Sequence, residues 1–271
     1  MEPVVEVRDL KKIYRGSEKP AIRNLNLAVG RGEMIGIIGP SGAGKSTLLR
    51  CINHLVIPTA GRIFIEGEEI TGASPAKVRK LRRRLGMVFQ HHNLVSRLTV
   101  MQNVMHGRLG YMNTLDGVLG RYTETDKQWA LSILEQTGLG DFLYHRAGEL
   151  SGGQRQRVGI VRALMQQPSV LLCDEPIASL DPASAQVVME LIRDVCRRQR
   201  SRVAGPPIAC IVNLHQVDAA LKYADRIIGM FEGEIVYDGP TAELTGPVIE
   251  RIYGKPMAEL MISAERPEVK V

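Results

Sequence analysis

The chain has 271 residues, of which 44% are hydrophobic and 24% charged, and its formal net charge is +6. This composition is typical of a globular protein that buries a sizeable core, as one large domain or a domain with a subdomain. It excludes a membrane-spanning protein, because no apolar run approaches the roughly 20 residues that such a helix needs. The first ten residues, MEPVVEVRDL, have neither a basic flank nor a long apolar segment, so we expect no signal peptide.

The four cysteines and the basic residues give weaker indications. Cys51, Cys173, Cys196 and Cys210 show no CxxC pair or metal-ligand spacing, so we expect small buried residues in a reducing cytosol. Basic residues cluster in VRKLRRRLG (78–86) and CRRQRSR (196–202). We expect each cluster to lie on a solvent-exposed helix face. Contact with an acidic partner or the cytoplasmic membrane face is the alternative, whereas nucleic acid is disfavoured because no stacking aromatics are interleaved.

The first thirty residues, and then residues 61–70, alternate apolar and polar positions with period two. VVEVRDL, LNLAV and GRIFIEGEEI (61–70) therefore predict three strands of an antiparallel β piece at the edge of the domain.

A second pattern follows, in which short and continuously apolar strands each precede a helix. MIGIIG precedes a helix over 45–55, SVLLCD one over 183–198, and IACIVNL one over 217–224. Such alternation is typical of a parallel α/β sheet that is buried on both faces.

Between these units, the chain from about residue 90 to residue 167 has helical periodicity. In QRQRVGIVRALMQ, Val158, Val161, Leu164 and Met165 fall on one helical face. We expect a helical subdomain, about 91–167, inserted into a domain that covers residues 1–250, with a C-terminal tail over 251–271.

GPSGAGKST (39–47) follows a strand and precedes a helix, which is the context that a phosphate-binding P-loop requires. The glycines let backbone N–H groups turn inward around phosphate oxygens, and the helix N-terminus adds its positive dipole. Lys45 can reach the β and γ phosphates, and the Ser46 hydroxyl can ligate Mg²⁺. The sequence therefore predicts that the chain binds a nucleoside triphosphate.

A P-loop needs a carboxylate partner for magnesium at the end of a neighbouring buried strand. SVLLCDEP supplies Asp174, which is placed to hold Mg²⁺ through water, and Glu175, which can polarise the attacking water. In LSGGQ (150–154), Ser151 is expected to cap a helix that begins near Gly152, whose free N–H groups and dipole favour an anion.

Five motifs follow one another in fixed order, and their combination resembles a known family. The P-loop, LSGGQ, LLCDEP, SLD (179–181) and NLHQ (213–216) are similar to the motifs of the ATP-binding cassette ATPases of ABC transporters. The resemblance runs from Val4 to about Gly239. It implies an α/β fold: a P-loop NTPase core with a mainly parallel sheet, an N-terminal antiparallel β subdomain and an inserted helical subdomain.

The resemblance also implies roles for individual residues. LSGGQ of one copy grips the γ-phosphate on the P-loop of a second copy, in a head-to-tail homodimer. Glu175, His215 and Gln90 are implied in catalysis, and Ser46, Gln90 and Asp174 in holding Mg²⁺. The implied ATP-binding residues are Tyr14, Gly39, Pro40, Ser41, Gly42, Ala43, Gly44, Lys45, Ser46, Thr47, Ser151, Gly152, Gly153, Gln154 and Asp181. Tyr14 would stack on adenine and Asp181 would cross the dimer interface, whereas His91 and His92 match no motif and are expected at the surface.

HGRLGYMNTLDGVLGRY (106–122), DEPIASLDP and NLHQVDAALKYADRIIGM look like the ATPase subunit of phosphonate importers. The implied partners are transmembrane permease subunits and, indirectly, a periplasmic solute-binding protein, without nucleic acid. The implied location is peripheral, on the cytoplasmic face of the inner membrane. Phosphonate, or a related small oxyanion such as phosphite, is the implied cargo. A non-transport cassette protein, such as a subunit of a phosphonate-degrading (C–P lyase) complex, is the alternative, while a P-loop kinase would need neither LSGGQ nor His215.

Overall fold

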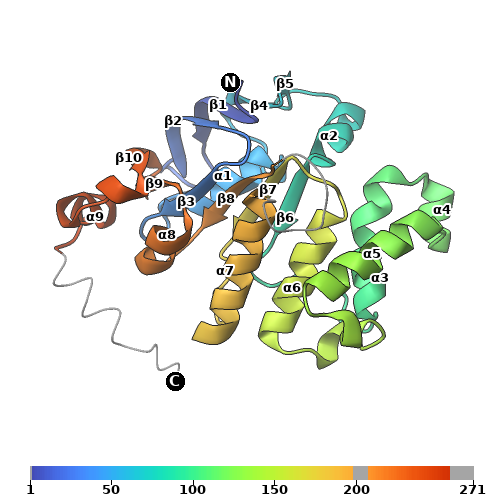
Figure 1. Ribbon diagram of the computed structural model, residues 1–271. Coiled ribbons are helices and arrows are strands. Elements are labelled where there is room, and N and C mark those ends of the chain that lie inside the picture. Colours follow the sequence, from blue (N-terminus) through green and yellow to red (C-terminus); the bar gives the residue numbers. More distant parts are fainter. Residues whose placement is uncertain (1, 198–206, 257–271) are drawn as a thin grey trace.

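Two β-sheets form the framework of the protein, and the computed structural model describes residues 2–197 and 207–256 (Figure 1). The first sheet is antiparallel. Its strand order is β2 (Ile22–Val29), β1 (Val5–Lys12), β4 (Ala60–Ile65) and β5 (Glu68–Glu69). The sequence predicted this antiparallel piece, but as one strand over 61–70. The structure breaks that strand at Glu66 and Gly67, both of which have positive φ and turn the chain back into β5.

The second sheet has five parallel strands and one antiparallel edge strand. Its order is β10 (Glu234–Pro240), β9 (Arg226–Phe231), β3 (Met34–Ile38), β8 (Ala209–Asn213), β7 (Val170–Asp174) and β6 (Leu85–Val88). Only β10 runs antiparallel to its neighbour. Every residue of β3, β7 and β8 is buried, which explains why these strands read as continuous apolar runs rather than alternating ones.

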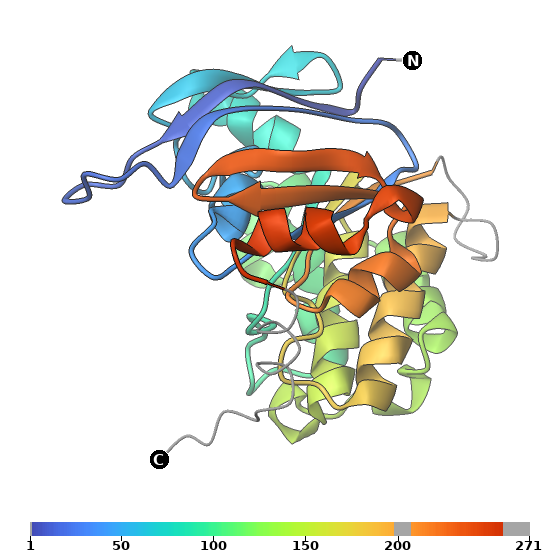
Figure 2. The same cartoon turned by 90° about the vertical axis from the view of Figure 1, so that its left-hand side faces the viewer.

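Helix α1 (Lys45–Ile52) lies between the two sheets, where Leu81 of α2 (Pro75–Arg82) also packs, and most of the other helices lie on the other side of the parallel sheet. The α-helices are α1 (Lys45–Ile52), α2 (Pro75–Arg82), α3 (Val100–Met105), α4 (Thr114–Leu119), α5 (Glu124–Gln136), α6 (Gly152–Leu164), α7 (Pro182–Arg197), α8 (Val217–Tyr223) and α9 (Gly246–Tyr253). Short 3₁₀ turns are η1 (His106–Tyr111), η2 (Gly140–Phe142), η3 (Ala147–Glu149) and η4 (Thr241–Glu243). In both views the antiparallel sheet lies at one end of the molecule and the lower ends of α6 and α7 at the other (Figure 2).

The core divides into two clusters on opposite faces of the parallel sheet. One fills the space between the sheets, where Leu48, Leu49 and Ile52 of α1 pack. The other joins the parallel sheet to α3, α5, α6 and α7, and includes the predicted apolar face of α6, with Val158, Val161, Leu164 and Met165 all buried. The α/β fold predicted from the sequence is therefore confirmed. Residues 90–167 carry helices, turns and one isolated β-bridge, between Thr99 and Arg146, and the expected boundary at residue 250 falls inside α9.

The register of the parallel strands decides where the functional side chains meet. Ile37 of β3 and Asp174 of β7 both pair with Asn213, the last residue of β8, and Val88 of β6 pairs with Cys173. The carboxyl ends of four parallel strands therefore share one edge, where α/β proteins bind their ligands. Within the described ranges, no helix is both long and apolar enough to cross a lipid bilayer. Part of the basic stretch 196–202 and most of the expected tail lie outside those ranges.

Candidate functional site

The loop from Gly39 to Gly44 connects β3 to α1 and forms a cradle at the shared strand edge. Gly39 (φ 147°) and Gly44 (φ 100°) have left-handed backbones, and a Cβ on either would collide with a backbone carbonyl, that of Met230 or of Ala21. Only glycine fits these two positions. The loop borders a cavity of about 250 Å³, lined by Ala21, Ser41, Gly42, Ala43, Gly44, Lys45, Ser46, Thr47, Glu175 and His215. The structure thus brings most of the predicted P-loop residues together with Glu175 and His215.

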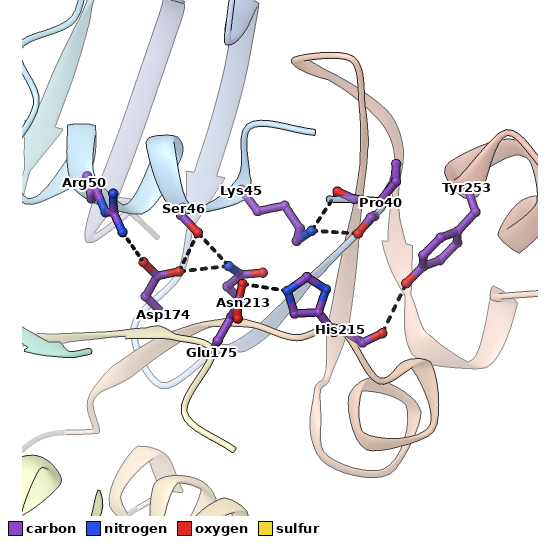
Figure 3. A network of polar contacts seen from close by, with 10 residues as sticks. Pro40, Lys45, Ser46, Arg50, Asp174, Glu175, Asn213, His215 and Tyr253 are labelled. Atoms are coloured by element: carbon purple, nitrogen blue, oxygen red, sulfur yellow. Dashed lines mark hydrogen bonds and ion pairs between the residues drawn. The ribbon is translucent and has the colours of Figure 1, made fainter. Parts of the chain in front are cut away.

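Lys45 is the buried cation of this cavity, with only 4% of its surface exposed. Its Nζ donates to the carbonyl oxygens of Gly39, at 2.6 Å, and Pro40, at 2.9 Å (Figure 3). Burial lowers the pKa of the Lys45 ammonium, and the nearby carboxylates of Glu175 and Asp174 oppose that shift. A cation held between loop carbonyls at a helix N-terminus is placed to move onto a bound phosphate.

Asp174 is the centre of a polar cluster at the end of β7. Its Oδ1 accepts from the Ser46 hydroxyl, at 2.7 Å, and from the Asn213 amide, at 2.9 Å. The same amide donates to Ser46 Oγ at 3.2 Å, and the Arg50 guanidinium lies 3.3 Å from Asp174 Oδ2 (Figure 3). Two strands and helix α1 therefore converge on one carboxylate.

This cluster fits a divalent cation of the magnesium type. Mg²⁺ prefers hard oxygen ligands, keeps several waters and is bound through one or two carboxylates. The Ser46 hydroxyl and the Asp174 carboxylate supply such oxygens, and the buried Oδ1 of Asn213 has no hydrogen-bond partner among the described residues. Ser46 and Asp174, both predicted as ligands, therefore lie in one place.

Glu175 and His215 form a second pair beside the cluster. His215 Nε2 donates to Glu175 Oε1 at 2.6 Å, and the His215 backbone carbonyl lies 3.5 Å from the Tyr253 hydroxyl (Figure 3). Glu175 has a left-handed backbone with φ of 52°, which costs an ordinary residue roughly 1–2 kcal/mol. Strain of this kind persists where the surrounding structure holds it, and it is common at functional sites.

Ser151 caps α6 as expected. Its hydroxyl accepts from Gln154 N at 3.2 Å, while Gln154 Oε1 accepts from Ser151 N at 2.8 Å, so the two residues form a reciprocal capping box. A Cβ on Gly153 would lie 2.9 Å from the Ser184 side chain, so a glycine lets α6 begin against the start of α7. None of the residues from Ser151 to Gln154 lines the P-loop cavity of the same chain.

Three further predicted residues, Tyr14, Gln90 and Asp181, do not line the P-loop cavity. The Tyr14 hydroxyl is 3.3 Å from Thr47 Oγ1, and 40% of Tyr14 is exposed, so its ring is available beside the P-loop. Gln90 is exposed in the turn that follows β6. Asp181 Oδ1 accepts from Ser184 N at 3.0 Å, a local cap at the start of α7, and this bond lowers the pKa of the Asp181 carboxyl.

Of the two histidines expected at the surface, His91 is exposed, whereas His92 is half-buried and contacts α6. His92 Nδ1 lies 2.5 Å from Gln156 Oε1, and because an amide oxygen only accepts, Nδ1 carries the proton. Arg162 also donates to the backbone carbonyls of His92 and Asn93. Burial lowers the pKa of His92. Gln156 and Arg162 belong to α6, so the segment after Gln90 is fastened to the helix that Ser151 caps.

A larger hollow, of about 790 Å³, lies away from the P-loop, between α2 and η1. Arginines line it beside an apolar floor, and its lining includes Leu55, Ile57, Val78, Arg79, Arg82, Arg83, Leu85, Met87, Phe89, His106, Tyr111 and Arg162. The Arg83 guanidinium lies over the Tyr111 ring at 4.9 Å, and its buried Nε has no hydrogen-bond partner among the described residues. The basic stretch 78–86 thus supplies one wall of a hollow and is not a fully solvated helix face.

Two contributors to the site, Asn213 and Arg50, and the contact of His92 with α6 were not predicted from the sequence. Asn213 stood inside the quoted NLHQ motif, and a polar residue that ends an apolar strand was its available signal. Arg50 lies one helical turn beyond Ser46 on α1, which places it on the same face. His92 had no signal, because its partner Gln156 is far away in the sequence.

Comparison with known proteins identifies the same family as the sequence motifs. The family model described as "ABC transporter" matches residues 22–178. The phosphonates import ATP-binding protein PhnC 2 of Oceanobacillus iheyensis is 49% identical over 95% of this chain and 98% of its own length. A protein of the same name from Halalkalibacterium halodurans is 51% identical over 92% of this chain and 99% of its own.

Solved structures of cassette proteins have the same fold. A dimeric ATP-binding cassette in a post-hydrolysis state, bound to ADP and phosphate, matches with a TM-score of 0.74 and 30% identity over 88% of this chain and 98% of its own. CbiO1 from Clostridium perfringens, part of the CbiONQ complex, matches with a TM-score of 0.75 and 27% identity, covering 98% of this chain and all of that protein.

Proposed function

The chain belongs to the ABC transporter family of ATP-binding proteins, and on that premise we propose that it energises the import of phosphonates through separate membrane subunits. The observation that carries the proposal is its likeness to two phosphonates import ATP-binding proteins at about half identity, over nearly the full length of both chains. ATP hydrolysis is the activity of this family, and the cavity described above brings the P-loop, Glu175 and His215 together.

In the proposed hydrolysis, the chain orients the nucleotide and moves one proton. The P-loop amides and Lys45 bind the phosphates, and Tyr14 stacks on the adenine. Glu175 accepts a proton from the water that attacks the γ-phosphorus, while His215 donates to Glu175 and fixes its orientation. Ser46, Asp174 and Gln90 would hold Mg²⁺, which would neutralise charge on the phosphates.

We further propose that the site is completed by a second copy of the chain. Two observations support this proposal. The start of α6, whose dipole favours an anion, does not line the cavity of its own P-loop. The structural relatives include a dimeric cassette that is 30% identical. Head-to-tail packing would place Ser151, Gly152, Gly153 and Gln154 of one copy over the phosphates of the other.

The larger hollow is proposed as the contact surface for a transmembrane permease, and a periplasmic solute-binding protein would act through that permease. Its apolar floor suits an inserted segment, and Arg79, Arg82 and Arg83 favour a segment that carries acidic side chains. Docking there would keep the chain at the cytoplasmic face of the inner membrane as a peripheral subunit.

A short-interval uptake experiment tests the import proposal. The gene is deleted, and entry of a radiolabelled alkylphosphonate is measured within the first minute, before cleavage of the carbon–phosphorus bond contributes. We expect the initial uptake rate to fall to background, and to return with the intact gene but not with a Lys45→Ala gene. Normal initial uptake with impaired growth on phosphonate would instead assign the chain to intracellular phosphonate breakdown.

A further inference from the structure

Asn213 is a fully buried polar residue at the end of β8, where the four residues before it are apolar. Register places it between Ile37 of β3 and Asp174 of β7. Its side chain points at the polar cluster of the nucleotide site, where Nδ2 lies 2.9 Å from Asp174 Oδ1 and 3.2 Å from Ser46 Oγ (Figure 3). A buried amide costs free energy unless its hydrogen bonds are made, so this position needs an explanation.

The Asn213 amide decides which lone pairs of Ser46 and Asp174 remain available to a cation. The Ser46 hydroxyl has one proton, which it gives to Asp174 Oδ1, and two lone pairs, one of which accepts from Asn213. One lone pair of Ser46 Oγ therefore stays free for a cation. Asp174 Oδ1 receives both donors and is saturated, so the carboxylate has only Oδ2, which lies 3.3 Å from the Arg50 guanidinium, left for further contacts.

The other end of the same amide is unsatisfied. Asn213 Oδ1 is buried and has no hydrogen-bond partner within the described residues. Mg²⁺ gives up its hydration water reluctantly and keeps several waters in protein sites. A carboxamide oxygen accepts from such a water without adding negative charge beside Asp174.

We propose that Asn213 is a positioning residue of the cation site: its Nδ2 orients Ser46 and Asp174, and its Oδ1 accepts from a cation-bound water. This inference rests on the proposed nucleotide function and adds a residue to that site. Partners that orient the ligands of a metal raise its affinity 10- to 100-fold in many proteins. Loss of Asn213 should therefore affect metal binding more than nucleotide binding.

Two substitutions test the proposal in the full-length protein. Asn213→Leu preserves the size of the side chain and Asn213→Ala avoids overpacking if leucine does not fit. Asn103→Ala is the matched control, because Asn103 is also fully buried but bonds only to its local loop, at Val95, Leu98 and Thr99. Thermal melting of each variant records its stability.

Metal and nucleotide are measured separately. Mn²⁺, the spectroscopic substitute for Mg²⁺, is titrated in the presence of a non-hydrolysable ATP analogue, and free Mn²⁺ is followed by electron paramagnetic resonance. We expect the half-saturating Mn²⁺ concentration to rise at least about 10-fold in both Asn213 variants and to stay unchanged in Asn103→Ala. Binding of a fluorescent ATP in EDTA should stay within about two-fold of the parent in all three.

Three results would overturn the inference: an unchanged Mn²⁺ titration in the Asn213 variants, an equal shift in the Asn103 control, or an equal loss of ATP binding in EDTA. Failure of the import proposal is a different result. A parent protein that binds ATP and Mn²⁺ in these titrations, but whose deletion leaves phosphonate uptake unchanged, would remove the importer assignment and leave the role of Asn213 intact.

Discussion

His215 Nε2 lies 2.6 Å from Glu175 Oε1, although the two residues are 40 positions apart in the chain. The contact exists because β7 and β8 are neighbours in register and each strand ends just before one of the two residues. Glu175 is held from this side while its strained backbone turns the carboxylate into the P-loop cavity. A fixed carboxylate that borders the phosphate cradle is well placed to act as a general base.

Glu175→Gln should leave ATP binding intact and slow hydrolysis by roughly 10²–10³-fold, about 3–4 kcal/mol of barrier, because the amide cannot take the proton. Steady-state phosphate release and equilibrium binding of ATP measure the two quantities. Hydrolysis by this variant at near the parent rate would show that another group is the base.

Mixing two inactive variants tests the shared active site. In a head-to-tail heterodimer of Lys45→Ala and Ser151→Arg, both lesions fall on one site and the other site is intact. An equal mixture should therefore regain activity, with about a quarter of all sites intact. The unmixed variants are the controls. Activity of the mixture that equals the mean of the two variants would contradict a shared site.

The hollow beside α2 should control coupling rather than chemistry. Arg82→Glu reverses a charge that lines it, so we expect uptake of phosphonate to fall about 10-fold while hydrolysis by the isolated subunit is unchanged. Arg23→Glu on β2, whose carboxylate partners are 3.8 Å away, is the control for a distant charge reversal. Equal uptake by both variants would argue against docking in the hollow.

The His92–Gln156 contact should stabilise the segment after Gln90 against α6. His92→Ala removes the donor to a buried amide oxygen, at a cost of about 1–2 kcal/mol, and should lower the melting temperature by several degrees. His92→Asn should retain most of the stability, because Asn carries a donor near the position of Nδ1 and tolerates the left-handed backbone at φ 59°. Equal melting temperatures for the Ala and Asn variants would show that the hydrogen bond contributes nothing.

Cys51 gives a pH dependence of stability with a definite sign. Burial on α1 raises the pKa of its thiol from 9.0 to about 11. The folded state disfavours the thiolate, so this contribution to stability is fully present below about pH 9 and is lost as pH rises through 11. The difference in unfolding free energy between the parent and Cys51→Ala should shrink over that range in urea titrations. In addition, native Cys51 should resist iodoacetamide at pH 8, since the thiolate is the reactive form. A pH-independent difference in unfolding free energy, together with rapid alkylation of native Cys51, would contradict the burial of this thiol.

The sequence by itself determined the fold class and the family. Apolar runs buried at every residue identify β3, β7 and β8, and GPSGAGKST between a strand and a helix identifies the phosphate cradle, because local backbone geometry decides both. The capping role of Ser151 is equally local, since a capping box spans only four residues.

Tertiary structure alone decided which distant side chains meet. The register of β8 against β3 and β7 places Asn213 between Ser46 and Asp174, and no spacing along the chain encodes that register. The contact of His92 with α6 was not predicted for the same reason, because it depends on how the turn after β6 packs on α6. Hydrogen bonds between residues far apart in sequence depend on packing, and packing exists only once the sheet and helices have assembled.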